Sequence, residues 1–284
     1  MSDVKLILKA DLSIPSLFNV KGKVAVVTGG SSGIGTMIAS AFVQNGATVY
    51  IAARKEKQLK EVCDRLNNEG PGTCYYFVAD LTTKAGCDSL TASIKERESK
   101  VHILVNNSGI SWGAPYENFP EKEGWDRLLA LNVKSIFYLT VALTDVLAKD
   151  ATNIDPGRII NISSVSAHVP SPYGNLSGDG NGTWSYSASK AAVNHLTTQL
   201  ASSLASKFIT VNAILPGIFP SKMTKYAFNE RGTIMTNDHP FGRLGAPRDM
   251  AGAALFLASP AGAYVSAAHI VVDGGNLASA KSHL

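Results

Sequence analysis

The most constraining feature of this sequence is a regular alternation of short β-branched or aromatic runs with longer amphipathic segments. The predicted strands are residues 23–28, 48–53, 74–79, 102–107, 158–163, 210–215 and 269–273. The predicted helices are residues 34–45, 56–68, 84–98, 124–148, 186–206 and 247–257. Such alternation requires right-handed crossovers and a parallel sheet buried on both faces. We therefore predict an α/β fold, a doubly wound seven-stranded parallel sheet with helices on both faces.

The composition indicates one domain. Of the 284 residues, 45% are apolar and 17% are charged, which suits one large core. We find no repeat of fixed period and no linker long enough to divide the chain. We expect an N-terminal arm at residues 1–20 and a single domain at residues 21–284.

Several classes of protein are excluded by what the sequence lacks. The net charge is only +4, without a basic cluster interleaved with aromatic residues, so we expect no nucleic-acid partner. Cys63, Cys74 and Cys87 form no CxxC pair and have no histidines at metal spacing, so we expect neither a metal site nor disulfides. The apolar run near the N-terminus is too short for a signal sequence or a membrane span, which favours a soluble protein without a membrane partner.

The first predicted strand ends in a glycine-rich turn, "TGGSSGIG", at residues 28–35. Glycines there let a diphosphate approach the free N–H groups at a helix N-terminus, where the helix dipole favours an anion. The candidate cofactor-binding residues of this turn are Gly29, Ser31, Ser32, Gly33, Ile34 and Gly35. A tight strand-to-helix connection would explain the glycines as well, so the turn needs support from other motifs.

The second strand ends in "IAAR", which bears on the choice of cofactor. Ala53 stands where an enzyme selective for NAD would place an acid for the ribose diol. Arg54 follows it, and a guanidinium can hold a ribose 2'-phosphate by charge-assisted hydrogen bonds. The pattern favours NADP(H), although Arg54 could also be a solvated loop residue beside Lys55 and Lys57.

Of the two tyrosines at residues 171–190, Tyr186 is the better catalytic candidate. It lies four residues before Lys190 in a segment with helical apolar spacing, so the two side chains share one face. Tyr173 has Ser177 at that offset. An adjacent ammonium and the positive charge of an oxidised nicotinamide would both favour the phenolate, so we expect the pKa of Tyr186 to be lowered.

Together these motifs resemble the short-chain dehydrogenase/reductase family, over nearly the whole chain from Lys21 to Gly275. They are "TGGSSGIG" at 28–35, "AD" ending at Asp80, "NNSG" at 106–109, "LN" ending at Asn132, "ISS" at 162–164, "YSASK" at 186–190, "PG" at 216–217 and "VDGG" at 272–275. Within the family, "NNSGISWGAP", "PGIFPSKMT" and "GAYVSA" resemble the 3-oxoacyl reductases linked to rhamnolipid synthesis. The resemblance implies a single-domain Rossmann fold.

The resemblance also implies a cofactor site. Asp80 would accept a hydrogen bond from the adenine amino group, although it could instead cap the following turn. Asn106 and Gly109 would flank the adenosine ribose at the end of the fourth strand. The other implied cofactor-binding residues are Leu81, Asn107, Ser108, Tyr186, Lys190, Pro216, Gly217, Ile218 and Ser221. Ser32 stands where many NADP-dependent members have a second basic residue.

Four residues would carry the chemistry by the same resemblance: Ser164, Tyr186, Lys190 and Asn132. Ser164 would hold the substrate carbonyl, and Tyr186 would give it a proton. Lys190 would lower the tyrosine pKa and bind the nicotinamide ribose. Asn132 would hold a water for proton relay, although a lone asparagine in "LALNVKS" could also mark a helix irregularity.

Two loops depart from the simple pattern. Tyr186 follows Ser164 by 22 positions, which is longer than the family usually has, so residues 168–184 form an insertion rich in Gly, Asn and Ser. It is either a tolerated surface loop or a pocket rim bearing Tyr173 and Trp184, and we favour the rim. Residues 217–245 would by resemblance cover the substrate as a lid and set chain-length preference.

These features predict an NADPH-dependent carbonyl reductase that converts a ketone reversibly to a secondary alcohol, with a 3-oxoacyl or similar substrate. The alternatives are a sugar or polyol reductase and a non-catalytic NADP-sensing scaffold. The family implies a homo-oligomer, a dimer or tetramer. We expect a cytoplasmic protein, or a peroxisomal one if Ser282, His283 and Leu284 act as a variant of the SKL import signal rather than as a frayed end.

Overall fold

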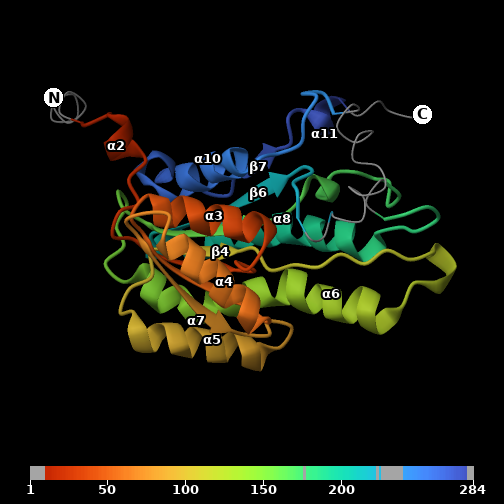
Figure 1. Ribbon diagram of the computed structural model, residues 1–284, viewed down its shortest axis with the longest axis horizontal. Coiled ribbons are helices and arrows are strands. Elements are labelled where there is room, and N and C mark those ends of the chain that lie inside the picture. The colour runs from red at the N-terminus through yellow and green to blue at the C-terminus, as the bar shows by residue number, and fades with distance from the viewer. Residues whose placement is uncertain (1–9, 175–176, 222–223, 225–238, 280–284) are drawn as a thin grey trace.

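The computed structural model describes residues 10–174, 177–221, 224 and 239–279, and its strands form one parallel sheet (Figure 1). The strands are β1 (Val24–Thr28), β2 (Thr48–Ala53), β3 (Thr73–Val78), β4 (Ile103–Asn106), β5 (Gly157–Ile162), β6 (Ile209–Pro216) and β7 (His269–Val272). Their order is β3-β2-β1-β4-β5-β6-β7, with every pairing parallel. The predicted doubly wound fold is confirmed. Because the strand order reverses between β1 and β4, a ligand crevice is expected at the carboxyl ends of these two strands.

Two helical layers cover the sheet. The longer helices are α3 (Gly33–Gln44), α4 (Glu56–Asn67), α5 (Lys84–Arg97), α7 (Ser135–Ala148), α8 (Trp184–Leu204) and α10 (Pro247–Ala258). Short helical segments are α2 (Ile14–Leu17), α6 (Arg127–Leu129), α11 (Asn276–Ser279), and the turns η1 (Tyr116–Asn118), η2 (Glu121–Asp126), η3 (Ala130–Lys134), η4 (Val165–Ala167), η5 (Ala205–Lys207) and η6 (Pro260–Gly262).

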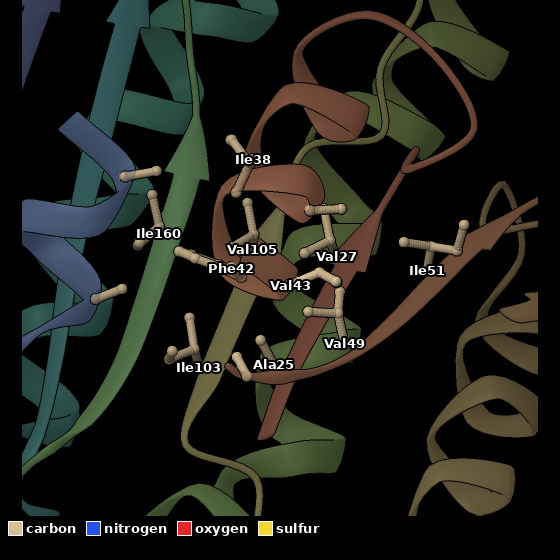
Figure 2. Packing of buried hydrophobic residues seen from close by; sticks show 14 of the residues in the cluster. Ala25, Val27, Ile38, Phe42, Val43, Val49, Ile51, Ile103, Val105 and Ile160 are labelled. Atoms are coloured by element: carbon tan, nitrogen blue, oxygen red, sulfur yellow. The ribbon is translucent and has the colours of Figure 1, made fainter. Parts of the chain in front are cut away.

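Alternate residues of the central strands pack into two separate cores, one on each face of the sheet. Ala25 and Val27 of β1 pack with Phe42 of α3 and with α4 and α10 (Figure 2). Val24 and Val26 face the opposite way and pack with α5, α7 and α8. Since successive side chains of a strand point to opposite faces, a sheet buried on both faces needs apolar residues at consecutive positions. This requirement explains the unbroken apolar runs of the sequence.

The helical run Glu121–Ala148 departs from a regular α-helix. The segments η2 and η3 within it are π-helical, and the run begins three residues before the predicted residue 124. Its length and composition would suffice to cross a membrane. Here, however, its α7 portion packs against α5 and against β4 and β5 as a core helix.

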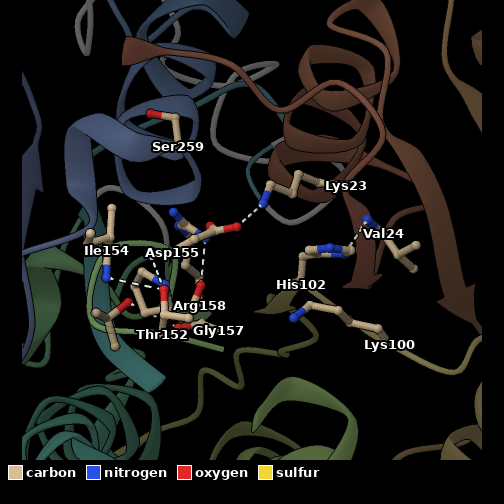
Figure 3. A network of polar contacts seen from close by, with 12 residues as sticks. Lys23, Val24, Lys100, His102, Thr152, Ile154, Asp155, Gly157, Arg158 and Ser259 are labelled. Atoms are coloured by element: carbon tan, nitrogen blue, oxygen red, sulfur yellow. Dashed lines mark hydrogen bonds and ion pairs between the residues drawn. The ribbon is translucent and has the colours of Figure 1, made fainter. Parts of the chain in front are cut away.

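A network of charged and polar side chains occupies the amino-terminal edge of the sheet (Figure 3). Arg158, at the start of β5, is 1% exposed and donates from Nη1 to Asp155 Oδ1 at 2.9 Å. Asp155 also pairs with Lys23 Nζ at 2.5 Å. His102 accepts the Val24 N–H on Nδ1 at 3.0 Å. The network thus ties the loop before β5 to the starts of β1 and β4.

The predicted arm and insertion contain little regular structure of their own. In the arm, α2 lies beside η6, and Val20 is buried. In the insertion, residues 168–183 form neither helix nor strand among those described, and residues 175–176 lie outside them. The insertion is joined to the loop after β4 by an isolated bridge between Ala114 and Gly182. Helix α8 begins at Trp184, two residues before the predicted start.

Candidate active site

A cavity of about 580 Å³ lies at the carboxyl edge, where the strand order reverses. Most of the residues predicted for the cofactor and the chemistry line it. They are Gly29, Ser31, Ser32, Gly33, Ile34, Arg54, Asp80, Leu81, Asn107, Ser108, Gly109, Ser164, Tyr186, Lys190, Pro216, Gly217 and Ser221. The fold thus brings six separate loops and one helix face to a single cavity.

The glycine-rich turn has the features of an anion site. Gly29 has a φ of +67°, a conformation that a residue with a side chain rarely adopts. Ser32 caps α3 without a side-chain hydrogen bond to the helix. The first N–H groups of this 12-residue helix therefore remain available to a diphosphate, which the helix dipole would also favour.

Arg54 and Asp80 line the same cavity, and the guanidinium affects the carboxyl group. Burial alone would raise the pKa of Asp80, but hydrogen bonds from Thr82 and the charges of Arg54 and Arg127 outweigh it, so the pKa lies below its usual value. Lys55 also lines this cavity. An anionic carboxylate at Asp80 can accept from an adenine amino group, and the cations beside it suit a phosphate.

The end of β4 is locked to the end of β1. Asn107 Nδ2 donates to the Thr28 carbonyl at 2.8 Å, and the Thr28 hydroxyl accepts from the N–H groups of Asn107 and Ser108. Asn106, in contrast, is buried inside the sheet and donates to Asn161 Oδ1 at 2.9 Å. The expectation that Asn106 flanks a ribose is therefore wrong, because its side chain points into the protein below the cavity.

Lys190 and Tyr186 lie on one face of α8, as their spacing predicts. Lys190 is 5% exposed, and its Nζ donates to the Ile162 carbonyl at 2.8 Å. This ammonium lies 5.6 Å from the centre of the Tyr186 ring. Burial lowers the pKa of Lys190 to about 8. The side chain is thus a cation near neutral pH that can release its proton in mild alkali.

The expectation of a lowered Tyr186 pKa counted on the charge of an oxidised nicotinamide as well as on Lys190, whereas the protein alone shifts this pKa upward. Burial raises the pKa of the phenol, and a hydrogen bond with Ser164 opposes the rise only in part. Withdrawal from water disfavours the phenolate. The phenol is therefore held in its protonated form, the form that can donate a proton to a carbonyl oxygen.

Asn132 lies behind the cavity wall in the π-helical turn η3. Its Oδ1 accepts from the Ile110 N–H at 2.9 Å, and its Nδ2 donates to the Ile110 carbonyl and to Ser189 Oγ. Ser189 in turn donates to the Tyr186 carbonyl at 2.7 Å. Both amide hydrogens are committed to protein acceptors, so a relay water at Asn132 would have to donate to Oδ1. The side chain links the loop after β4 to the turn of α8 that carries Tyr186.

Ser164 stands at the end of β5 and caps η4. Its hydroxyl accepts from the Ser166 N–H at 3.1 Å and lies within hydrogen-bonding reach of the Tyr186 phenol. Ser163, which precedes it, donates instead to the Lys190 carbonyl at 3.1 Å. Of the two neighbouring serines, Ser164 is the one next to Tyr186, whereas Ser163 fastens β5 to α8.

Besides Asn106, two further predicted cofactor residues do not line this cavity. Gly35 is buried in α3, where an added Cβ would lie 2.5 Å from Asn107 Nδ2, so it permits the close packing of the two loops. Ile218 lines a separate cavity of about 230 Å³, and Phe219 borders both cavities. Of the predicted lid, residues 222–223 and 225–238 lie outside the described residues.

Sequence reasoning missed other lining residues. They are Ala53, Lys55, Gln58, Ala79, Ile110, Ser111, Leu131, Ile162, Ser163, Ser166, Thr183, Phe219 and Thr224. Most are direct neighbours of predicted residues in the chain. Their positions just after the ends of the strands could therefore have identified them as lining residues. Of the insertion residues that the structure describes, Thr183 reaches the cavity, whereas Tyr173 and Trp184, which we expected on its rim, do not line it. Among the described residues, no group of three or more His, Cys, Asp or Glu side chains could hold a metal ion.

Comparison with known proteins places the chain in a family. The family model described as short chain dehydrogenase matches residues 23–232. A rhamnolipids biosynthesis 3-oxoacyl-[acyl-carrier-protein] reductase of Pseudomonas aeruginosa is 39% identical, over 91% of this chain and 97% of the relative. A gluconate 5-dehydrogenase of Gluconobacter oxydans is 32% identical, over 93% of this chain and 98% of the relative.

A solved structure extends the likeness to three dimensions. The Pseudomonas aeruginosa RhlG/NADP active-site complex has a TM-score of 0.83 and 38% identity, covering 92% of this chain and 98% of that one. The predicted family is therefore confirmed. The chain belongs to the short-chain dehydrogenase family of oxidoreductases, which act on CH–OH groups.

Proposed function

We propose that this protein is an NADPH-dependent carbonyl reductase that converts a ketone reversibly to a secondary alcohol. The observation that carries the proposal is the meeting of Tyr186, Lys190 and Ser164 with a glycine-rich turn in one cavity. The cofactor fits this chain's own residues. The uncapped start of α3 suits a diphosphate, and Arg54 beside Lys55 suits a 2'-phosphate.

The protein residues have distinct roles in the proposed reaction. Bound NADPH supplies the hydride that reaches the carbonyl carbon. Ser164 donates a hydrogen bond to the carbonyl oxygen, and the protonated Tyr186 gives that oxygen its proton. The Lys190 ammonium stabilises the phenolate left behind, and it holds the nicotinamide ribose. Asn132 holds the turn of α8 in register with the loop after β4, and it accepts from a relay water through Oδ1.

The choice of NADPH over NADH rests on Arg54. With no acid at Ala53 to repel it, a 2'-phosphate can pair with the guanidinium, and Arg54→Ala should weaken NADPH binding about 10-fold or more while leaving NADH binding nearly unchanged. Isothermal titration with both cofactors measures this. Equal affinity of the wild-type protein for both cofactors would refute the assignment. Lys57→Ala, which removes a nearby cation from the first turn of α4, serves as the control.

The proposed substrate class is a 3-oxoacyl thioester, supported by the 3-oxoacyl reductase relative. The gluconate 5-dehydrogenase relative supports a second candidate, a sugar or polyol reductase. A panel of 3-oxoacyl thioesters and keto-sugars, assayed with NADPH, separates the two by kcat/KM. If the protein binds NADPH but reduces neither class, a non-catalytic NADP-sensing role would be favoured.

Two further proposals concern assembly and location. Phe137 and Val141 of α7 are 45% and 56% exposed, and such an apolar helix face would suit a dimer or tetramer. Sedimentation at the mass of one chain would refute assembly. Ser282, His283 and Leu284, which lie outside the described residues, would direct peroxisomal import. Identical cytosolic distribution of fluorescent fusions with and without this tripeptide would refute import.

A further inference from the structure

Three aromatic side chains contact one another where the insertion meets the loop after β4. The Trp184 ring lies between two tyrosines, tilted against Tyr116 with ring centres 5.1 Å apart and edge-to-face with Tyr173 with ring centres 5.5 Å apart. Trp112 lies on the same loop as Tyr116. We call Trp112, Tyr116, Tyr173 and Trp184 the aromatic ledge. Tyr116 and Tyr173 are 67% and 51% exposed, so the ledge presents apolar surface to solvent.

The ledge is held in place by backbone contacts rather than left as a loose loop. Ala114 and Gly182 exchange two main-chain hydrogen bonds, of 3.3 and 2.9 Å. Thr183 donates from both its N–H and its hydroxyl to the Pro172 carbonyl, which closes the insertion on itself. An added Cβ at Gly182 would lie 2.5 Å from Trp184 Nε1, so the glycine allows this segment of the backbone to pack directly against the indole.

The ledge adjoins the cavity along the chain at two points. Ser111 and Thr183 line the same cavity as Ser164 and Tyr186. Each is followed directly in the chain by a ledge residue, Trp112 and Trp184 respectively. A substrate tail that left the cavity between Ser111 and Thr183 would therefore reach the aromatic surface.

We propose that the aromatic ledge binds the apolar tail of the ketone substrate and thereby sets the preference for long acyl chains. This proposal rests on the proposed ketone-reductase function. Exposed aromatic rings on a braced loop offer apolar contact at low cost in conformational entropy. Each methylene removed from water at the ledge should raise kcat/KM about 4-fold. The tail contacts contribute to selectivity, whereas Tyr186 and Lys190 act on the reacting carbonyl whatever the chain length.

The test compares chain-length preference between variants. The ratio of kcat/KM for twelve-carbon and four-carbon 3-oxoacyl N-acetylcysteamine thioesters is measured for Tyr116→Ala and Tyr173→Ala. Each variant should lower this ratio about 10-fold, with four-carbon kcat/KM and NADPH affinity nearly unchanged. Tyr116→Phe and Tyr173→Phe should retain the ratio, because they keep the ring. Tyr264→Ala removes a fully exposed tyrosine that lines neither cavity and serves as the control.

The outcomes separate this proposal from the one on which it rests. An unchanged ratio in both alanine variants would overturn the ledge while leaving ketone reduction intact. Equal loss on both thioesters would also overturn it, since a general disturbance of the site would then be the cause. If the wild-type protein reduces keto-sugars but neither thioester, the ledge proposal fails while ketone reduction stands; if it reduces no ketone of either class, both proposals fail.

Discussion

The two edges of the sheet each bury a cation, and they do so in opposite ways. At the carboxyl edge, Lys190 donates to a main-chain carbonyl, and among the described residues no carboxylate forms a salt bridge with it. At the amino edge, Arg158 is paired with Asp155, which is also paired with Lys23. A buried charge without a counter-ion is costly to folding, whereas a paired one costs far less.

This difference separates the roles of the two edges. Burial shifts the pKa of Lys190 to about 8, so the carboxyl edge holds a group that can change protonation during a reaction. At the amino edge, the hydrogen bonds and charges of Lys23 and Arg158 overcome the effect of burial and hold the pKa of Asp155 below its usual value. We therefore assign catalysis to the carboxyl edge of the sheet and structural stability to the amino edge.

The largest effect should come from removing the proton donor at the carboxyl edge. Tyr186→Phe should lower kcat by about 10²–10⁴-fold, the usual contribution of a general acid, because the phenylalanine cannot donate a proton. NADPH affinity should change little, since the ring is retained. Steady-state kinetics and fluorescence titration measure the two quantities. Tyr173→Phe is the matched control and should keep full activity; the reverse pattern would mean that the insertion has relocated the site.

A smaller effect, on stability alone, is expected from the amino edge. Asp155→Asn should lower the free energy of unfolding by about 1–3 kcal/mol, because it leaves the buried Arg158 without its carboxylate. The half-exposed position of Asp155 screens the pair and favours the low end of this range. Urea unfolding measures the change, and kcat should stay at the wild-type value. Asp64→Asn, which breaks a solvent-exposed pair with Lys60, should lower the free energy of unfolding much less than Asp155→Asn does. A loss of turnover in Asp155→Asn without loss of stability would contradict the division of roles.

The smallest expected effect is the loss of stability as the pH falls below 7. Burial, aided by the charges of Lys23 and Lys100, lowers the pKa of His102 to about 4. Between this value and the usual value near 6.5, the unfolded chain binds a proton that the folded protein does not, so stability falls as the pH drops through this window. From pH 7.5 to 6, the loss should be about 1 kcal/mol or less. His102→Asn keeps an acceptor for the Val24 N–H and should make the free energy of unfolding less dependent on pH between 6 and 7.5. If the slope of this free energy against pH is the same in the variant, groups other than His102 cause the pH dependence.

The contrast between the edges also shows what the sequence can reveal. The motifs of the carboxyl edge are local: Tyr186 and Lys190 share a helix face at a spacing of four, and the glycine turn follows a strand directly. The amino edge has no such signal, because Lys23 and Asp155 are 132 positions apart and only the parallel sheet brings them together. The sequence predicts a doubly wound parallel sheet but not the order of its strands, because periodicity does not specify which strands are neighbours.

Within the site, the errors have physical causes. Asn106 and Asn107 are adjacent in "NNSG", and only strand register decides which of them faces the cavity. The π-helical turn at Asn132 agrees with the helix irregularity that the lone asparagine in "LALNVKS" indicated as an alternative, although apolar spacing alone does not specify such a turn. The raised pKa of Tyr186 depends on burial by distant segments, which the spacing of Tyr186 and Lys190 does not report.

The most direct test of the division between the edges is Lys190→Met, measured for both turnover and thermal unfolding at pH 7. Below pH 8, Lys190 is protonated in both the folded and the unfolded chain, so the folded protein bears the cost of the buried charge. Between about pH 8 and 10.5 the folded protein loses this proton while the unfolded chain keeps it, so stability rises with pH. Methionine keeps the apolar stem without the charge. We predict that turnover falls about 100-fold or more, that the unfolding temperature at pH 7 stays level or rises because the cost of the buried charge is removed, and that the alkaline rise in stability disappears. Near-normal turnover with a large fall in unfolding temperature would contradict it, because Lys190 would then serve the fold rather than the reaction.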